Sequence, residues 1–304
     1  MSPECVRFVA GRFFLNDSGL TLRATSEKIL QVYLDTFVYI NQNIVYSFGR
    51  GSSQKNIDMD SFKHMSIPVP PSDIQKKIVA ECETVDAECV KAQSGILKAN
   101  AEINQLIEYI HNDTKCPLQT VDEISTSVEY GSSAKSQKAG KVPVIRMGNI
   151  KDGKIDWNDL VYSDNEEEIS KYSLKYNDVL FNRTNSPELV GKVGIYKGEQ
   201  PAIFAGYLIR INYIPTKINP VYLCYILNSA KIREYGFSVM SKSVNQANIN
   251  GSLLKQYKIP VPSLEEQNAI VAKLEKIEQQ IEDAQKILDS AFAKKQAILD
   301  KYLQ

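Results

Sequence analysis

The 304-residue sequence predicts an α+β protein in which β-rich domains with short helices are separated by two long helices that pair as an antiparallel coiled coil. Three observations lead to this prediction. A block of sequence repeats at long range, each copy is followed by a heptad pattern of apolar residues, and strand-like segments lie between the two heptad patterns. We therefore expect a duplicated domain-plus-helix module.

The repeat has a constant offset over its best-conserved part. Every matched pair there differs by 192 in residue number, as Gln75 and Gln267 do, and no gap is needed. Upstream the match continues after a three-residue shift, with Val32–Leu34 against Val221–Leu223. A chain with two copies of one module is suited to contact two similar sites at a fixed separation. The matched segments are Gln54–Ile57 and Gln246–Ile249, Ile67–Pro70 and Ile259–Pro262, and Ile78-Val79 and Ile270-Val271.

A proline boundary and a long helix follow each copy of the repeat. Pro68–Pro71 and Pro260–Pro262 mark the boundary, because proline lacks a backbone donor and disfavours helix at the residue before it. Acidic residues in the first turn favour the positive end of a helix dipole. The candidate N-caps with their acidic neighbours are Ser72 with Asp73 and Ser263 with Glu265.

Apolar residues in each helix alternate steps of four and three, the signature of a coiled-coil seam. Each helix measures roughly 55–60 Å at about 1.5 Å per residue, and so narrow a seam needs a partner. The other copy is the nearest partner and gives an antiparallel pair; the alternatives are packing on the helix's own domain and homo-oligomerisation. The seam positions are Ile78, Cys82, Val85, Cys89, Ala92, Ile96, Ala99, Ile103, Leu106 and Ile110, and then Ile270, Leu274, Ile277, Ile281, Ala284, Leu288, Ala291, Ile298 and Tyr302, interrupted by Lys295.

Composition excludes several classes of protein. The sequence has neither a long apolar run nor a signal-peptide pattern, so we expect no membrane partner and no export. Five cysteines without metal spacing fit a reducing cytoplasm. With 36 basic and 36 acidic residues the net charge is zero, which argues against indiscriminate binding to nucleic acid but leaves a local basic surface open.

The sequence offers no catalytic constellation. Its two histidines, His64 and His111, have no paired nucleophile in any motif, so neither a triad nor a zinc site can be argued. Asn219–Tyr222 superficially resembles the Asn-Pro-Pro-Tyr element of amino-methyltransferases, but its third residue differs and no glycine-rich cofactor loop precedes it. We therefore expect a protein that is not an enzyme and binds no cofactor.

Residues 117–262 are predicted to form one complete β-rich domain. Val142–Met147 alternates like a strand, and Asn149–Ile155 contains an Asp152-Gly153 turn typical of a hairpin. The acidic run Glu166–Glu168 indicates a solvated face. The further strands expected are Asp178–Asn182, Lys192–Lys197 and Ile203–Ile211, and the helices are Asn219–Asn228 and Ala230–Tyr235.

In order and duplication these motifs resemble the DNA-specificity subunit of type I restriction–modification systems, a family with two target-recognition domains separated by two conserved helical spacers. The likeness covers essentially the whole chain. It is most specific in the Ile-Pro-Val-Pro run that enters each helix with Glu266-Gln267 and Ile270-Val271. The other segments that carry it are Gly131–Lys135, Val142–Arg146, Asn149-Ile150, Gly153–Ile155, Asp178–Asn182, Gly191–Gly194, Asn245-Gln246 and Asn248-Ile249.

The resemblance implies four segments along the chain. Residues 1–70 would be the C-terminal half of a first target-recognition domain, 71–116 the first spacer helix, 117–262 a complete second target-recognition domain and 263–304 the second spacer helix. The first domain lacks a counterpart of about Pro117–Leu189, so we expect it to expose apolar surface. A separate polypeptide that supplies the missing half, a longer fusion and a truncated remnant all remain open.

Specific reading of duplex DNA requires arginine for guanine, asparagine or glutamine for adenine, and basic side chains for phosphates. Two polar loops, Asn182–Ser186 and Ser241–Gln246, combine these residue types. Arg146, in a predicted strand, could equally be a structural ion-pair partner. The candidate DNA-binding residues are Ser133, Lys135, Arg146, Asn149, Lys151, Asn182, Arg183, Thr184, Asn185, Lys192, Ser243, Asn245 and Gln246.

The implied function is a non-catalytic subunit that binds double-stranded DNA and docks methyltransferase subunits on its helices. By resemblance, the methyltransferases bring S-adenosylmethionine and a separate restriction and translocase subunit uses ATP, so neither cofactor should bind to this chain. Self-association or a complementing half-domain remains a further possibility. The alternative function is a truncated assembly scaffold that no longer reads DNA.

Overall fold

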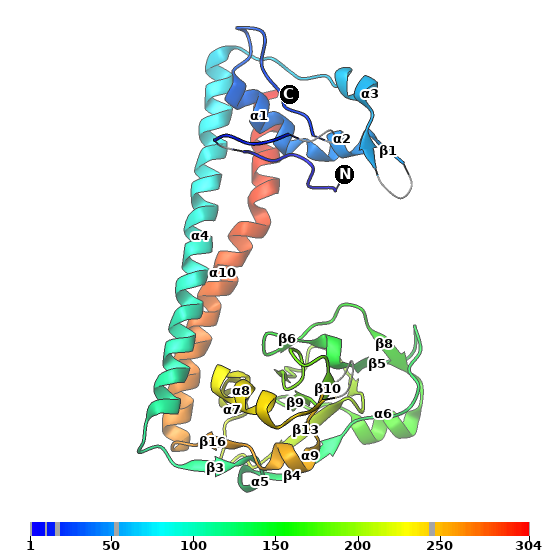
Figure 1. Cartoon of the computed structure of the whole chain (residues 1–304), viewed down its shortest axis with the longest axis vertical. Helices are drawn as coiled ribbons and strands as arrows, with labels where there is room; N and C mark the ends of the chain where they lie inside the picture. Colours follow the sequence, from blue (N-terminus) through cyan, green and yellow to red (C-terminus); the bar gives the residue numbers. More distant parts are fainter. Residues whose placement is uncertain (1, 10, 16–18, 52–54, 243–246, 304) are drawn as a thin grey trace. The chain divides into compact units, whose positions relative to one another are not determined.

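The computed structural model describes residues 2–9, 11–15, 19–51, 55–242 and 247–303. The chain divides into two compact units, which Figure 1 shows. Unit 1 comprises Met1–Ala99 and Gln279–Gln304, and unit 2 comprises Asn100–Glu278. Sheets and two long helices together give the mixed α and β fold that the sequence predicted.

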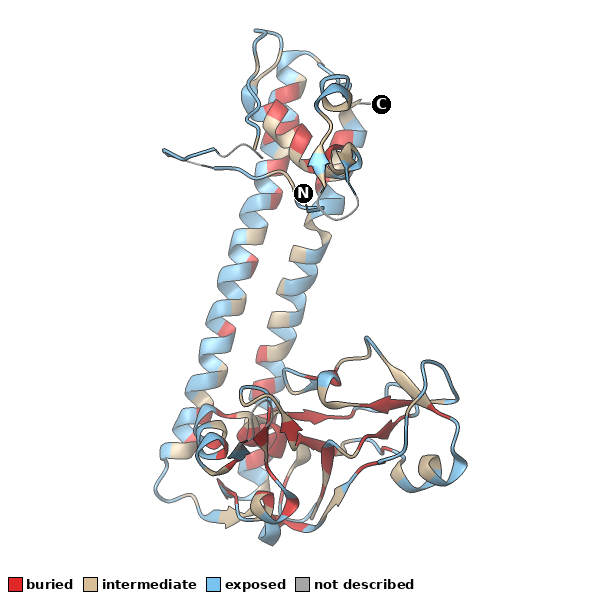
Figure 2. Cartoon of the chain, turned by 45° about the vertical axis from the view of Figure 1, so that its right-hand side comes forward, coloured by how far each residue is buried: buried red, intermediate tan, exposed pale blue. Residues whose placement is uncertain are grey.

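Unit 2 is built on a six-stranded mixed sheet. Its strand order is β4-β13-β9-β11-β7-β6, with antiparallel pairing except between β11 and β7. The two central strands, β9 and β11, are buried at every position and carry only one polar residue, Asn182, because both faces of the sheet are covered (Figure 2). The strand bounds are β4 Ser125–Tyr130, β6 Ile150–Lys151, β7 Lys154–Ile155, β9 Val179–Asn182, β11 Val193–Ile195 and β13 Leu208–Tyr213.

Asp152 and Gly153 form the predicted hairpin turn between β6 and β7. Both residues have positive φ, 48° and 79°, which asparagine, aspartate and glycine tolerate best. The hairpin begins after η1 (Met147–Asn149), a short 3₁₀ helix. The strand Val142–Met147 is shorter than predicted, because β5 (Val142–Ile145) ends where this 3₁₀ turn starts.

The predicted strand Ile203–Ile211 is wrong as a single element. It is divided into β12 (Ile203–Phe204) and β13, because Gly206 turns away to donate its N–H to the carbonyl of Ser132 at 2.6 Å. β12 then pairs with β5 in a second sheet of order β12-β5-β8, where β8 is Val161–Ser163. A third pair joins β16 (Lys258–Pro260) to β3 (Leu118–Thr120).

Helices cover the sheets of unit 2. The main core contains the buried faces of β9 and β13 together with α7 (Pro220–Asn228) and α8 (Ala230–Val239). Asn219 caps α7, since its side chain accepts from the N–H groups of Val221 and Tyr222. This capping explains the Asn-Pro-Val-Tyr sequence structurally. The remaining helices are α5 Val121–Ile124, α6 Glu166–Tyr172, whose first turn is the acidic run, and α9 Gly251–Lys255.

Unit 1 repeats the second half of unit 2. Its elements are α1 (Gln31–Ile40), α2 (Gln42–Ser47), the hairpin of β1 (Gly49–Arg50) and β2 (Asn56–Ile57), and α3 (Met59–Lys63). They correspond in order to α7, α8, the antiparallel pair of β14 (Ser241–Lys242) and β15 (Ala247–Asn248), and α9. α2 has six residues and α8 has ten; α8 begins one position earlier in the repeat, at the counterpart of Asn41, and its other three additional residues account for the three-residue shift.

One tertiary contact confirms the repeat at the level of single atoms. The hydroxyl of Tyr33 donates to the carbonyl of Pro68 at 2.8 Å, and the hydroxyl of Tyr222 donates to that of Pro260 at 2.9 Å. Both tyrosine side chains are fully buried. Burial raises the pKa of Tyr33 to about 12 and that of Tyr222 further, so both hydroxyls remain protonated donors.

The two long helices are α4 (Ser72–Asn112) and α10 (Leu264–Leu303). Ser263 caps α10 in a capping box with Glu266. The prediction that Ser72 caps α4 is wrong by one residue. The helix includes Ser72, and the carbonyl of Pro71 accepts from the N–H groups of Ile74 and Gln75.

The helices run antiparallel in each unit. In unit 1, three of the ion pairs join α4 to α10. The higher the residue number of the α4 partner, the lower that of its α10 partner, as an antiparallel arrangement requires. In unit 2, Ile107 and Ile110 of α4 share one core with Val271 and Leu274 of α10. Elsewhere along the seam Ala92 and Ala99 are buried, while Ile96 and Ile281 are only half-buried. The ion pairs are Glu81 with Lys301, Asp86 with Lys295 and Glu88 with Lys294.

Candidate nucleic-acid interface

The predicted loop Asn182–Ser186 contributes β10 (Thr184–Asn185) to a small three-stranded sheet in unit 2, and of the predicted loop Ser241–Gln246 only Ser241 and Lys242 lie within the described residues. β10 pairs antiparallel with β15, which also pairs with β14. The side-chain amide of Asn248 donates to Oγ1 of Thr184 at 2.7 Å and fastens β15 to β10. Residues 186–240 separate β10 from β14 in sequence, so only the folded sheet unites these segments.

Arg183 is held between backbone and aromatic groups beside this small sheet. Its guanidinium lies 4.8 Å from the ring centroid of Tyr130, and Nη1 donates to the carbonyl of Gly206 at 3.2 Å. Its Nε is buried and makes no hydrogen bond within the described residues. The Tyr130 hydroxyl in turn accepts from the N–H of Gly251 at 2.7 Å, which fixes the ring. The guanidinium is thus positioned in advance of any ligand.

The segment Gly131–Lys135 borders the same region. The N–H of Ser132 donates to the carbonyl of Phe204 at 2.8 Å, so this segment lies beside the turn at Gly206. Gly131 is required, since a Cβ there would stand 2.3 Å from the same carbonyl oxygen. Ser133 and Lys135 are exposed, as is the ring of Tyr207. We call the surface made by Tyr130–Lys135, Arg183–Ser186, Gly206-Tyr207, Ser241 and Asn248 the polar face.

Of the ten candidate residues that the structure describes, three are buried and support the local structure. Asn149 is only 3% exposed, and its Oδ1 accepts from the N–H of Arg146 at 3.0 Å. Its Nδ2 donates to two backbone carbonyls of the same loop. Asn182 is fully buried in β9 and Thr184 is used by Asn248. We therefore assign these three side chains to loop geometry, which leaves fewer residues for contact with a ligand.

Two basic candidates form ion pairs away from the polar face. Arg146 follows β5 and donates to both the carbonyl and the carboxylate of Asp159 at 2.6 and 3.1 Å. Lys151 in β6 pairs with Asp156. Both pairs are partly exposed, so their cations remain available to a phosphate. The pair with Lys151 lowers the pKa of the Asp156 carboxyl group.

Of the other candidates, two shape the backbone of their loops and three lie outside the described residues. Asn185 is half-buried, and its Oδ1 accepts from the N–H of Ser186 at 2.8 Å, which shapes the loop after β10. Lys192 is half-buried in the turn before β11, and its carbonyl accepts from the N–H of Asn182. Ser243, Asn245 and Gln246 lie outside the described residues.

Sequence reasoning missed three residues that organise the polar face. Tyr130 and Tyr207 are large exposed aromatics beside Arg183, and aromatic rings next to basic groups could have indicated a nucleic-acid surface. Arg233 of α8 clamps the loop after β10, because its guanidinium donates to the carbonyls of Glu188 and Val190. Burial lowers the pKa of Arg233, though a guanidinium stays charged.

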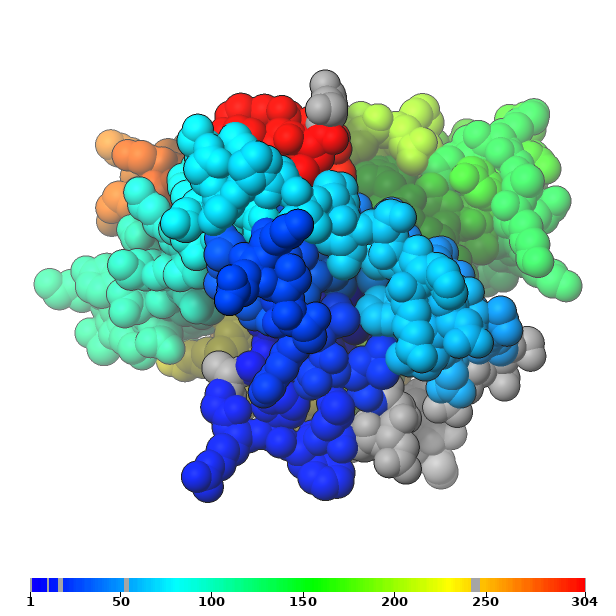
Figure 3. All heavy atoms as spheres, turned by 90° about the horizontal axis from the view of Figure 1, so that it is seen from above, coloured from blue at the N-terminus to red at the C-terminus, as the bar shows by residue number. Residues whose placement is uncertain are grey.

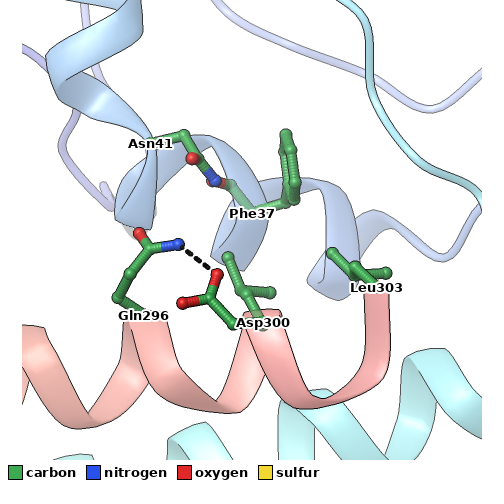
Figure 4. A pocket seen from close by; sticks show the side chains of 6 residues that line it. Phe37, Asn41, Gln296, Asp300 and Leu303 are labelled. Carbon is green, nitrogen blue, oxygen red and sulfur yellow. Dashed lines mark hydrogen bonds between the residues drawn. The ribbon is translucent and has the colours of Figure 1, made fainter.

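Other described surfaces offer less support for a functional site. A shallow hollow in unit 1 is lined by Phe37, Asn41 and Leu303, with Gln296 bonded to Asp300 at 3.0 Å (Figure 4). Within the described ranges no three His, Cys, Asp or Glu side chains are grouped to hold a metal ion. Across those same ranges, no helix combines the length and apolar character that membrane crossing requires.

Comparison with known proteins gives one consistent result. The sequence matches the family model described as "Type I restriction modification DNA specificity domain" over residues 6–100 and 121–290. These two segments contain the two copies of the repeat.

Curated relatives carry the same description. A putative type I restriction enzyme MjaX specificity subunit of Methanocaldococcus jannaschii is 37% identical over 158 residues, which is 50% of this chain and 37% of the relative. The type I restriction enzyme EcoKI specificity subunit of Escherichia coli is 26% identical over 277 residues, 83% of this chain and 59% of the relative. The chain thus spans less than two thirds of the length of either protein.

Solved structures agree in fold. The crystal structure of a type I restriction–modification system S subunit from M. genitalium has a TM-score of 0.57 at 15% identity and covers 91% of this chain and 73% of its own. The HsdS subunit from Thermoanaerobacter tengcongensis has a TM-score of 0.51 at 19% identity, covering 88% and 70%.

Proposed function

The chain belongs to the type I restriction modification DNA specificity family, and we propose that it recognises a DNA sequence for such a system. The observation that carries this proposal is the polar face of unit 2. There the fold pairs β10 with β15 and holds Arg183 against Tyr130. A guanidinium fixed in this way can bind guanine bidentately at little entropic cost.

Within this proposal the segments have separate tasks. Residues 117–262 are the complete target-recognition domain, 1–70 the C-terminal half of a first one, and 71–116 and 263–304 the spacer helices. Lys135, Lys151 and Lys192 contact phosphates, which position the protein without reading sequence. The helices dock methyltransferase subunits, and a restriction subunit joins through that complex. Catalysis belongs to those partners.

Selection of binding sites from random duplex DNA, with a methyltransferase subunit present, tests the proposal. One complete recognition domain should enrich an ungapped half-site. Enrichment of a palindromic bipartite site would mean that two copies of the chain bind together. If no sequence is enriched at any salt concentration, the chain is an assembly scaffold and the proposal fails.

A further inference from the structure

A carboxylate without a cation borders the polar face of unit 2. Glu188 is exposed, and its Oε1 accepts from the hydroxyl of Ser186, a residue of the polar face, at 2.6 Å. Within the described part of the chain, no basic side chain pairs with this carboxylate. Like charges that meet in an interface repel, and DNA presents a dense row of negative phosphates. A carboxylate at this position would therefore weaken DNA binding unless it meets a hydrogen-bond donor of the DNA.

The backbone of the loop that carries Glu188 is held by several hydrogen bonds. Arg233 of α8 binds this loop, yet its Nη2 donates to the carbonyl of Glu188 at 2.7 Å and its Nη1 to that of Val190, not to the carboxylate. The N–H of Val190 donates to the carbonyl of Ser186 at 3.0 Å and closes a turn. Gly191 follows with a φ of 83°, and a Cβ there would lie 3.1 Å from Nη1 of Arg233. The loop thus has a fixed backbone, while the carboxylate of Glu188 stays free of a counter-ion.

The Glu188 carboxylate is ionised and keeps the capacity to accept a further hydrogen bond. Hydrogen bonds from the Ser186 hydroxyl and from its own backbone N–H lower the pKa of Glu188, so the group is charged at neutral pH. An ionised carboxylate only accepts, and it offers about four lone-pair sites, more than these two bonds use. The bond to Ser186 also restricts the direction of the group. Glu188 is therefore a positioned acceptor at the edge of the polar face.

Cytosine is the base that suits such an acceptor. In the major groove guanine presents two acceptors, and thymine presents an acceptor and a methyl group. Adenine presents an amino donor beside the acceptor N7, whereas cytosine presents only its N4 amino group. A carboxylate is repelled by each of the acceptors, so it favours cytosine over the other three bases.

We propose that Glu188 determines specificity by accepting a hydrogen bond from the N4 amino group of a cytosine in the DNA site, and that Arg233 is the positioning residue that holds its loop. This role rests on the proposed function, because only a chain that recognises DNA has a base to read there. The carboxylate selects in two ways, by a contact with cytosine and by repulsion of the acceptors on the other bases. Repulsion of this kind gives specificity at the expense of affinity for unrelated DNA.

Parallel selections from random duplex DNA test the proposal, using the full chain with a methyltransferase subunit present. The unsubstituted chain should enrich a site with a fixed cytosine at one position that Glu188→Gln changes to adenine. The reason is that a glutamine amide can pair bidentately with N6 and N7 of adenine. Every other position of the site should stay the same. In titrations, Glu188→Gln should bind the cytosine site at least about fivefold more weakly and bind unrelated DNA no more weakly than before.

Two further variants separate base reading from charge and from folding. Arg233→Lys keeps the charge but loses the rigid fork that binds two carbonyls, so it should relax the preference at this one position and at no other. Glu167→Gln removes the same charge from an exposed position of α6, in the part of unit 2 that is green in Figure 3. It should change neither the selected site nor the affinity.

Three outcomes would overturn the inference while leaving the proposed function intact. The first is that the unsubstituted chain and Glu188→Gln enrich one identical site. The second is that Glu188→Gln or Arg233→Lys weakens the preference at all positions alike, since the loop would then only support the fold. The third is that Glu167→Gln has the same effect as Glu188→Gln, which would reduce the effect to net charge. Enrichment of no sequence by the unsubstituted chain is a different result, because it removes the proposed function and this role with it.

Discussion

Gln75 and Gln267, one in each unit, make the same three hydrogen bonds. Each side chain is fully buried and accepts from one backbone N–H, that of Leu30 or Asn219, at 2.8 Å. Each Nε2 then donates to two carbonyls, one before the first helix of its module and one in the proline segment. These joints attach each globular part to its long helix. The carbonyl acceptors are Lys28 and Pro70 for Gln75, and Lys217 and Pro262 for Gln267.

Replacing either glutamine by alanine should destabilise its own unit by about 1–3 kcal/mol, because a buried N–H and two carbonyls lose their partners. A chain of two units need not unfold in one step, so native-state hydrogen exchange is the suitable measurement. Gln75→Ala should accelerate exchange at the amide of Leu30, and Gln267→Ala at that of Asn219. Gln256→Ala, at an exposed position, should change neither rate. Unchanged exchange in both variants would exclude the joint as a source of stability.

Lys295 of α10 should be replaceable by methionine. It interrupts the apolar seam, is 7% exposed, and pairs with Asp86 while its Nζ lies 5.4 Å from the ring centroid of Tyr39. Lys295→Met removes the cost of burying a cation and should leave the free energy of unfolding of unit 1 unchanged or raise it by about 1 kcal/mol. Asp86→Asn should lower it by about 1 kcal/mol, since Lys295 then lacks its partner.

A double-mutant cycle in denaturant checks the assignment. In the Lys295→Met background, Asp86→Asn should have no further effect. An undiminished effect there would show that Asp86 acts through another group.

His111 should make the stability of unit 2 depend on pH. Its Nε2 lies 2.8 Å from Oγ of Ser229, and burial, with a smaller effect of Lys231, lowers its pKa below the ordinary value of 6.5. The folded state therefore binds fewer protons than the unfolded state. Stability should fall as pH drops below 6.5, and this loss is complete once pH is below the folded pKa. His111→Gln should flatten this part of the profile, whereas His64→Gln, at an exposed site in unit 1, should not alter it.

Arg183→Ala should cost about 1–3 kcal/mol of binding free energy on a selected DNA site and much less on unrelated DNA. Arg183→Lys keeps the charge but not the bidentate geometry, so it should lose most of the same discrimination. Lys135→Ala is the matched comparison. As a phosphate contact it should weaken binding to both DNAs alike and reduce the salt dependence by about one charge. Titrations on both DNAs at several salt concentrations measure all three, and equal losses with Arg183→Ala would remove it from base recognition.

The sequence predicted those parts of the fold that depend on local sequence pattern alone. The seam, the proline boundaries and the shift between Val32–Leu34 and Val221–Leu223 all follow from residue order, and the structure agrees. The division of Ile203–Ile211 was not predictable, because it depends on Gly206 bonding to Ser132, which lies far away in sequence. The burial of Asn149 could not be predicted for the same reason. An asparagine that stabilises a loop and one that contacts a base are the same residue in a sequence, and only the fold distinguishes them.

The difference in length between α2 and α8 records how the module has changed since it was duplicated. From Lys28 to the first helix the copies differ by 189 in residue number, and from the hairpin strands onward they differ by 192, so the three extra residues of the second copy lie between α7 and β14. Three residues are nearly one helical turn, and a turn added there returns the chain to almost the same direction. The module therefore accommodates three further residues in this stretch. Ser47 is accordingly a suitable point to introduce a short fluorescent or affinity label without disturbing either joint.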